Sequence, residues 1–324
     1  MYDNNNDVED KYTLKHNFKG FGGQQVLFAL KTLGAAFKFE QVILSHINLL
    51  LFGKIIKYIK PSTKVILWAH GIEVWRPIPS WKKKFLQEKA EIWAVSNYTK
   101  QQLIEWHKID EDKIKILHNT LDPFLEIPKA FGKPNYLLDR YKIKPNTFVL
   151  FTLTRLANSE HQKNYDLVIT CLNKLKLQYP NLVYLIGGKA DTEEQARLQK
   201  LINNNHLEDR IKLIGFIDEA EITDHFCLAD CFILPSKKEG FGIVLIEAAA
   251  CGCQVIGGNL DGSTDALLNG KLGRMVSPDS ELEIINAIQN TLANHTHQPK
   301  AQQKLTVAHF GFEQYIEKVN CLIG

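Results

Sequence analysis

The chain has 324 residues, which is enough for two α/β domains of ordinary size. Its 45% hydrophobic and 23% charged content is typical of a soluble globular protein and argues against a disordered or fibrous chain. No apolar run approaches the roughly 18 residues of a membrane-spanning helix, so no such helix is predicted in this sequence.

The charge is distributed unevenly along the chain. Residues 1–145 carry 23 Lys and Arg against 15 Asp and Glu, and the remaining residues carry 16 against 21. A basic first half predicts attraction to anionic lipid head groups or to a phosphate-bearing acceptor. The run Trp81-Lys82-Lys83-Lys84 adds an aromatic ring to three positive charges on a predicted amphipathic helix, although an ordinary solvated helix face has the same pattern.

Cysteine usage indicates the compartment. All six cysteines fall in the second half, mostly inside apolar runs, and none forms a CxxC set with zinc spacing. Reduced, buried thiols are expected, which points to the cytoplasm. Residues 1–10 are polar and acidic rather than a secretory leader. We therefore expect a cytoplasmic protein, with peripheral contact on the inner face of the membrane as a candidate property of the basic first domain.

Short apolar runs alternate with helical patterns through the first half. This alternation predicts a parallel α/β sheet. The expected strands are Gln41–Leu44, Lys64–Trp68, Glu91–Val95 and Lys113–Leu117, and the expected helices are Gln24–Phe37, Asn48–Tyr58, Trp81–Lys89 and Tyr98–His107.

The second half repeats this plan more completely. Short links between strands and helices predict a doubly wound parallel sheet, whose ligand should lie outside the carboxyl ends of the strands. The expected strands are Thr147–Thr152, Asn181–Ile186, Arg210–Ile214, Cys231–Leu234, Cys253–Ile256 and Gly273–Val276. The expected helices are Asn164–Gln178, Glu193–Asn204, Glu219–Leu228, Gly242–Cys251, Thr264–Leu268 and Ser280–Ala293.

A proline-rich stretch separates the two halves. Residues 122–145 contain four prolines and Gly132, which is typical of an interdomain connection. We predict a first domain over residues 1–128 and a second over 129–308, facing one another across a cleft. Residues 309–324 predict an amphipathic C-terminal helix that is a candidate to pack back on the first domain.

Two glutamates eight positions apart carry the strongest functional signal. Glu239 and Glu247 flank Gly240-Phe241-Gly242, with Glu239 at the carboxyl end of a predicted strand and Glu247 about two turns into the next helix. Backbone N–H groups at such a helix start favour phosphate, whereas carboxylates suit sugar hydroxyls that donate hydrogen bonds. The arrangement predicts a sugar-nucleotide site, and solvated surface glutamates are the alternative.

Two cations follow the first strand of the same predicted sheet. Arg155 leaves the strand end and Lys163 stands just before the next helix. A planar guanidinium and a mobile ammonium at one strand-to-helix crossing suit a diphosphate. Singly, each residue is more often a surface residue, but together with the Glu-framed loop they favour the functional interpretation.

In the first half, His70 ends an apolar strand before Gly71 and is a candidate for contact with a sugar hydroxyl or for steadying charge at the reacting carbon. A structural histidine bonded to a loop carbonyl is the alternative, and His46 is a weaker candidate of the same kind. Asp110-Glu111-Asp112 spells a metal-binding DxD pattern, but the strand that follows favours a solvated turn.

These motifs together resemble the retaining glycosyltransferases of family 4, which have the GT-B fold of two Rossmann-like domains facing a cleft. Glu239 and Glu247 resemble that family's E-x7-E signature, and Arg155 and Lys163 resemble its diphosphate-binding pair. The resemblance runs from about residue 18 to the end. Further segments that carry it are His70–Trp75, Ala94–Thr99, Leu117–Asp122 and Gly257–Ser263.

The resemblance implies a metal-independent enzyme without a cofactor, which uses a nucleoside-diphosphate sugar as donor. Glu239 would bind sugar hydroxyls, Glu247 would hold the ribose, and Arg155 and Lys163 would stabilise the departing diphosphate. His70 would approach the donor sugar from the other domain. The amides of Gly240, Phe241, Gly242 and Ile243 would lie beside the sugar and phosphate, and Gly215, Phe216 and Ile217 would supply backbone contacts to the base.

The start of the chain departs from the family pattern. Family members usually begin with a strand and a Gly-Gly loop, whereas residues 1–15 predict no strand and Gly22-Gly23 stands late. We expect a first domain without its first strand, either N-terminally truncated or using Gly22-Gly23 as a substitute.

The leading hypothesis is transfer of a sugar to a glycan or lipid-linked acceptor in polysaccharide, glycolipid or cell-envelope synthesis in a bacterium. The alternatives are a catalytically impaired sugar-nucleotide-binding partner subunit and a GT-B-type epimerase or phosphorylase. No partner nucleic acid is expected.

Overall fold

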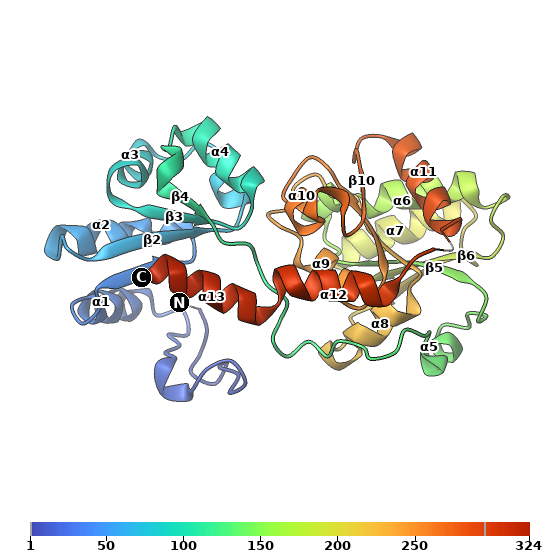
Figure 1. Ribbon diagram of the computed structural model, residues 1–324, viewed down its shortest axis with the longest axis horizontal. Helices are drawn as coiled ribbons and strands as arrows, with labels where there is room; N and C mark the ends of the chain where they lie inside the picture. The colour runs from blue at the N-terminus through green and yellow to red at the C-terminus, as the bar shows by residue number, and fades with distance from the viewer. Residues whose placement is uncertain (1, 295) are drawn as a thin grey trace. The chain divides into compact units, whose positions relative to one another are not determined.

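The computed structural model describes residues 2–294 and 296–324, which form two compact units (Figure 1). Unit 1 runs to Ala94 and includes Lys100–Ile116, and unit 2 comprises Val95–Thr99 and Leu117–Gly324. Each unit contains one parallel sheet with helices packed on it. The α/β prediction for both halves is therefore confirmed.

The sheet of unit 1 has four parallel strands in the order β1-β2-β3-β4. Every neighbour pair is consecutive in the chain, so each crossover helix carries the chain to the adjacent strand. From residue 2 to residue 40 the structure describes helices and turns but no strand, as the sequence predicted. The strands are β1 (Gln41–Leu44), β2 (Lys64–Ala69), β3 (Glu91–Ala94) and β4 (Ile114–Ile116).

Side chains along β2 point alternately to the two faces of the sheet, and this alternation determines which of them pack against the helices of unit 1. Val65, Leu67 and Ala69 point to one face and share a buried cluster with side chains of α2, α3 and α4. The β2 residues of opposite parity, such as Ile66, point to the other face. The helices are α1 (Gln25–Ala36), α2 (Leu50–Ile59), α3 (Ser80–Lys89) and α4 (Asn97–His107).

The sheet of unit 2 has six parallel strands in the order β10-β9-β8-β5-β6-β7. The chain runs outward from β5 through β6 to β7 and then returns to place β8 on the other side of β5. This reversal makes the gap between β5 and β8 the topological switch point of the sheet. The strands are β5 (Phe148–Leu153), β6 (Leu182–Gly187), β7 (Ile211–Gly215), β8 (Cys231–Leu234), β9 (Gln254–Gly258) and β10 (Arg274–Val276).

Helices cover both faces of this second sheet. Helices α6, α7 and α11 contribute to the buried cluster on one face, and α8, α9 and α12 lie on the opposite face (Figure 1). The helices of unit 2 are α5 (Asn135–Arg140), α6 (Tyr165–Leu175), α7 (Thr192–Asn204), α8 (Ile222–Leu228), α9 (Ile243–Ala250), α10 (Ser263–Ala266), α11 (Glu281–Leu292), α12 (Pro299–Phe310) and α13 (Phe312–Ile323).

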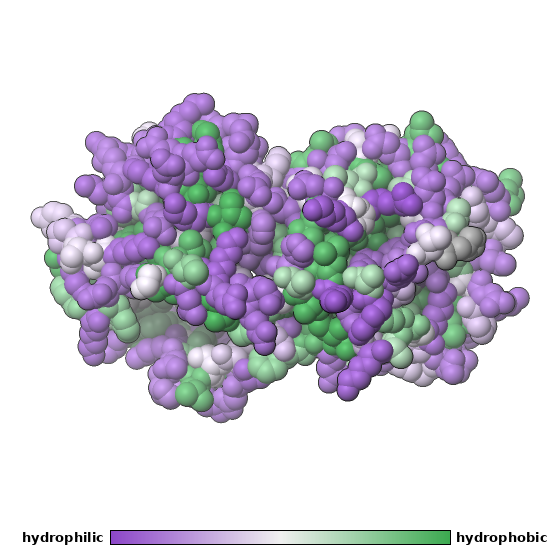
Figure 2. All heavy atoms as spheres, in the orientation of Figure 1, coloured by the Kyte–Doolittle hydropathy of each residue, from purple (hydrophilic) through white to green (hydrophobic). Residues whose placement is uncertain are grey.

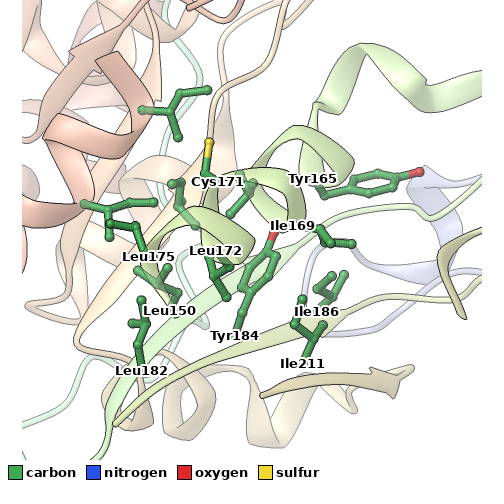
Figure 3. Packing of buried hydrophobic residues seen from close by; sticks show 14 of the residues in the cluster. Leu150, Tyr165, Ile169, Cys171, Leu172, Leu175, Leu182, Tyr184, Ile186 and Ile211 are labelled. Atoms are coloured by element: carbon green, nitrogen blue, oxygen red, sulfur yellow. The ribbon is translucent and has the colours of Figure 1, made fainter. Parts of the chain in front are cut away.

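The core of unit 2 forms where α6 lies over the central strands (Figure 3). Leu172 and Leu175 project from α6 toward Leu150 of β5, and Tyr184 of β6 packs beside them. The Tyr184 hydroxyl lies 2.7 Å from Thr152 Oγ1, so the buried polar atom has a partner. This rigid centre fixes the strand ends from which the site loops leave.

The sequence missed two helices of unit 2. Helix α5 lies inside the proline-rich stretch that was predicted to be a connection. A proline is compatible with the start of a helix, and Pro134 directly precedes α5. Helix α12 was not predicted because its buried positions include the polar residues Gln303 and Thr306, which weaken the apolar pattern. The domain boundaries near residues 128 and 308, and the packing of the C-terminal helix, stay predictions.

The visible surface is mostly hydrophilic, with hydrophobic side chains scattered among charged ones (Figure 2). Among the described residues, no helix combines the length and the apolar character that crossing a bilayer requires. The six cysteines are free thiols, and four of them are buried.

The packing of α6 can be tested by truncating a core side chain. Leu172→Ala should lower the free energy of unfolding by about 2–5 kcal/mol, because Leu172 is 2% exposed in the core cluster. Leu177→Ala, at a leucine that is 90% exposed, is the matched control and should change it by less than about 0.5 kcal/mol. Equal losses in urea titrations of the two variants would contradict this packing.

Candidate functional site

The candidate site lies at the carboxyl ends of β5 and β8, beside the switch point of the unit 2 sheet. The loop after β5 carries Arg155 and Lys163, and the loop after β8 carries Glu239. Because β5 and β8 are neighbours in a parallel sheet, both loops emerge at the same edge. In open α/β sheets, ligands bind in the crevice that this reversal creates.

Lys163 and Glu239 meet directly across this crevice. Lys163 Nζ lies 2.6 Å from Glu239 Oε2, and the two side chains are only 13% and 19% exposed. A cation and a carboxylate that are largely removed from water interact more strongly than an exposed pair. The structure therefore brings together two of the predicted site residues from segments 76 positions apart in the chain.

Arg155 is held by a different carboxylate. Arg155 NH2 lies 2.8 Å from Glu160 Oε1, while 82% of the arginine side chain is exposed. Glu160 also accepts a hydrogen bond from Gln162 Nε2 at 2.8 Å. Both candidate diphosphate-binding cations are thus paired with carboxylates, and an anionic ligand has to replace these partners.

A third loop, after β9, fastens the Glu239 loop. Asp261 is 1% exposed, and its carboxylate accepts hydrogen bonds from the amides of Glu239 at 2.7 Å and of Ser263 at 2.9 Å. Burial raises the pKa of Asp261 to about 6, although these N–H groups favour the ionised form. The amide of Gly262 in turn donates to the carbonyl of Glu239 at 2.8 Å.

Glycine is required where these two loops touch. A Cβ at Gly262 would lie 2.1 Å from the carbonyl oxygen of Gly240, which is closer than any real contact. Gly242 has φ +94° and directly precedes α9, so the backbone there adopts a conformation that favours glycine. These constraints restrict the backbone between Glu239 and α9.

Phe241 has a structural side chain rather than one that faces a ligand. It is 1% exposed, stacks on His118 with ring centroids 5.6 Å apart and meets Phe310 edge-on at 5.5 Å. Only the backbone of Phe241 is therefore available for the predicted donor contact. Ile243, at the first turn of α9, is 43% exposed.

Glu247 lies just over one turn into α9, which begins at Ile243, and its side chain is partly buried. Burial raises the pKa of Glu247 to about 7, and the nearby carboxylate of Asp122 raises it further. A carboxyl group near neutrality can accept or donate hydrogen bonds to hydroxyls. This environment favours a ligand-binding glutamate over a solvated one.

Gly215 ends β7, and Phe216 and Ile217 follow it at the same edge of the sheet, two strands away from β5. Gly215 has φ +74° with open space around it, and Phe216 is 75% exposed. Ile217 is buried at 6%, so its side chain anchors the turn. Their predicted contact with a base stays a prediction.

His70 belongs to unit 1 and follows β2. It is exposed, its amide donates to Glu73 Oε1 at 2.6 Å, and its ring lies 4.9 Å from that of Trp68. His46 caps the turn before α2, since its Nδ1 accepts from the amide of Asn48 at 3.0 Å. The role of His70 toward a donor sugar stays a prediction.

Sequence reasoning missed three acidic residues. Asp265 accepts hydrogen bonds from Asn97 and lies 3.2 Å from His118 Nε2; burial alone would raise its pKa, but these partners outweigh burial and lower it. Asp261 had a local signal, because an Asp two residues before a Ser after a strand is typical of an Asx turn. Glu160 had no such sequence signal, since its pairing with Arg155 depends on how the loop folds.

Comparison with known proteins assigns the sequence to a family. Residues 139–306 match the profile of the family described as glycosyl transferases group 1, which is more than half of the chain. The chain belongs to this family. The match covers β5 to β10 and the three loops of the candidate site.

Curated relatives are similar over part of their length. The gpi3 subunit of phosphatidylinositol N-acetylglucosaminyltransferase from Schizosaccharomyces pombe is 28% identical over 44% of this chain and 30% of its own. The GDP-mannose-dependent α-(1-6)-phosphatidylinositol monomannoside mannosyltransferase of Mycolicibacterium smegmatis is 29% identical over 53% and 45%, respectively. The chain thus spans less than half the length of the curated relatives it matches.

Solved structures share the fold over most of their length at low sequence identity. Anabaena HepE in complex with UDP has a TM-score of 0.80 at 19% identity, covering 93% of this chain and 83% of its own. A glycosyltransferase of Rickettsia africae has a TM-score of 0.78 at 20% identity, covering 94% and 83%. The GT-B fold class that the motifs predicted is confirmed.

The raised pKa of Glu247 predicts a pH-dependent stability. A carboxyl whose pKa is raised on folding stabilises the folded state below its ordinary pKa, and this contribution is lost as pH rises through about 7. The Gln variant does not titrate at this position. The free energy of unfolding of Glu247→Gln, relative to that of the natural chain, should therefore rise by about 1–3 kcal/mol as the pH is raised from roughly 5 to 8. Thermal unfolding at both pH values measures it, and a difference that does not change with pH would show that Glu247 is not buried as described.

Proposed function

We propose that the chain is a glycosyltransferase that transfers a sugar from a nucleoside-diphosphate sugar to an acceptor. The observation that carries the proposal is the largely buried pair of Lys163 and Glu239 at the switch point of a Rossmann-like sheet. Membership of the glycosyl transferases group 1 family supports the same conclusion. We infer that the substrate replaces this ion pair, placing its diphosphate on Lys163 and its hydroxyls on Glu239.

The remaining site residues receive roles from their chemistry. Arg155 is exposed at the same loop and would add a planar cation to the diphosphate, so that the two cations stabilise the charge that grows as the glycosidic bond breaks. Glu247, with a pKa near 7, would hold the ribose hydroxyls. The amides of Gly240 to Ile243 would contact sugar and phosphate, those of Gly215 to Ile217 the base, and His70 the sugar.

The finer assignments follow from the family resemblance. We propose transfer with retention of the anomeric configuration, without a catalytic metal, in the synthesis of a bacterial polysaccharide, glycolipid or other cell-envelope glycan. Free, mostly buried thiols support a cytoplasmic location. Relatives act on GDP-mannose or are bound to UDP, so UDP and GDP are the first nucleotides to test.

Nucleoside-diphosphate binding tests the site. Arg155→Ala, Lys163→Ala and Glu247→Ala should each weaken binding of the best nucleotide by about 10- to 100-fold, because each removes a charged hydrogen bond worth about 1.5–3 kcal/mol. Isothermal titration calorimetry of the full chain measures this. Lys144→Ala, at an exposed lysine before β5, is the control and should bind as the natural chain does.

Unaltered binding in all three variants would refute the site. Binding that weakens as expected, without release of sugar from any sugar nucleotide, would instead favour the partner-subunit alternative. Anomer analysis of the product by NMR tests retention.

The pairing of Arg155 with Glu160 predicts a substitution that strengthens nucleotide binding instead of weakening it. Glu160→Gln should tighten nucleoside-diphosphate binding by about two- to fivefold, because the phosphate no longer competes with a carboxylate worth up to about 1 kcal/mol. Glu208→Gln changes the net charge equally at an exposed position remote from the loop and should leave affinity unchanged. Weaker binding of Glu160→Gln would mean that Glu160 positions Arg155 for the ligand instead of masking it.

A further inference from the structure

Unit 1 contains a groove that the donor site does not use. It has a volume of about 520 Å³, within the range of small-ligand sites, and lies between the neighbouring helices α2 and α3. Every residue that lines it belongs to unit 1. These residues are Lys54, Lys57, Tyr58, Pro61, Trp81, Lys84, Phe85, Glu88 and Lys89.

The groove is strongly cationic. Four lysines line it against one glutamate, and residues 50–63 and 80–90 together hold seven lysines and only Glu88 as an acid. Glu88 lies 3.9 Å from Lys84, at the limit of an ion pair, and both side chains are largely exposed. One surface carboxylate compensates little of this charge.

Neutral groups hold several of these lysines in place. Lys57 Nζ donates to the carbonyl of Pro61 at 2.9 Å, Lys60 Nζ to that of Phe39 at 2.8 Å, and Lys82 Nζ to Asn48 Oδ1 at 3.0 Å. A neutral oxygen orients an ammonium group without cancelling its charge. The positive potential of α2 and α3 is therefore available to an anion.

Aromatic and aliphatic side chains border the cations. The Trp81 ring lies 5.3 Å from Lys54 Nζ and 5.8 Å from Lys82 Nζ, within the range of cation–π contacts. Tyr58 is 88% exposed, and Leu51 and Ile59 of the same helix are about half exposed. Exposed aromatic and aliphatic groups beside lysines are typical of surfaces that enter the headgroup region of a bilayer.

We propose that the α2–α3 groove binds the phosphate headgroup of an anionic phospholipid at a membrane surface. The lysines would meet the phosphate, while Trp81, Tyr58 and the flanking aliphatic side chains would lie at the boundary with the acyl chains. A soluble polyanion matches the lysines but leaves the apolar rim in water. The inference uses only residues of unit 1 and does not depend on the proposed transfer activity.

Vesicle sedimentation of the full chain tests the proposal. The protein should sediment with vesicles of phosphatidylcholine mixed with phosphatidylglycerol and not with phosphatidylcholine alone. The triple variant Lys54→Gln, Lys57→Gln and Lys84→Gln should bind on the order of 100-fold more weakly, at about 1 kcal/mol, or fivefold, for each lysine. Trp81→Ala should weaken binding severalfold, and Trp81→Phe should restore most of it.

A matched control separates the groove from general charge. Lys144→Gln, Lys200→Gln and Lys271→Gln together remove the same charge from exposed positions of unit 2 and should bind the mixed vesicles as the natural chain does. The proposal would be overturned if the two triple variants lost vesicle binding equally. It would also be overturned if the lysine substitutions weakened vesicle binding and Trp81→Ala did not, or if glycerol phosphate displaced the protein fully from the vesicles. Unchanged melting temperature and nucleoside-diphosphate binding show that the variants are folded.

Discussion

The pairing of Lys163 with Glu239 depends on how the sheet of unit 2 reverses direction. The chain leaves β5 in one direction and returns on its other side as β8, so two loops distant in sequence emerge together. The pair then lies 2.6 Å apart and largely out of water. In the proposed function a diphosphate would replace the carboxylate as the partner of Lys163, and sugar hydroxyls would replace the ammonium as partners of Glu239.

The rest of the site keeps this pair in position. Asp261, itself buried, accepts a hydrogen bond from the Glu239 amide, the Gly262 amide donates to the Glu239 carbonyl, and the absence of a side chain at Gly262 lets the loops after β8 and β9 touch. Phe241 is buried against His118 and anchors the start of α9. The position of Glu239 therefore depends on neighbouring residues that hold its loop, as a preorganised site requires.

The sequence predicted most of the architecture because apolar runs and helical patterns alternated clearly, and every predicted strand appears within about two residues. It also proposed Arg155, Lys163 and Glu239 as site residues, because charged residues at strand ends are a local signal, and their roles stay predictions. It did not identify Glu160 or Asp265, whose partners depend on tertiary folding. Helix α12 was not predicted because two of its buried residues, Gln303 and Thr306, are polar. Both donate hydrogen bonds to backbone carbonyls, which no local sequence pattern reveals.

Hydrogen–deuterium exchange of the full chain, with and without UDP or GDP, tests the central claim most directly. The account predicts that whichever nucleotide binds will slow exchange in residues 154–164 and 236–248, where the loops after β5 and β8 carry the two cations and the two glutamates. Protection confined to other segments, or no protection by any nucleoside diphosphate at saturating concentration, would contradict it.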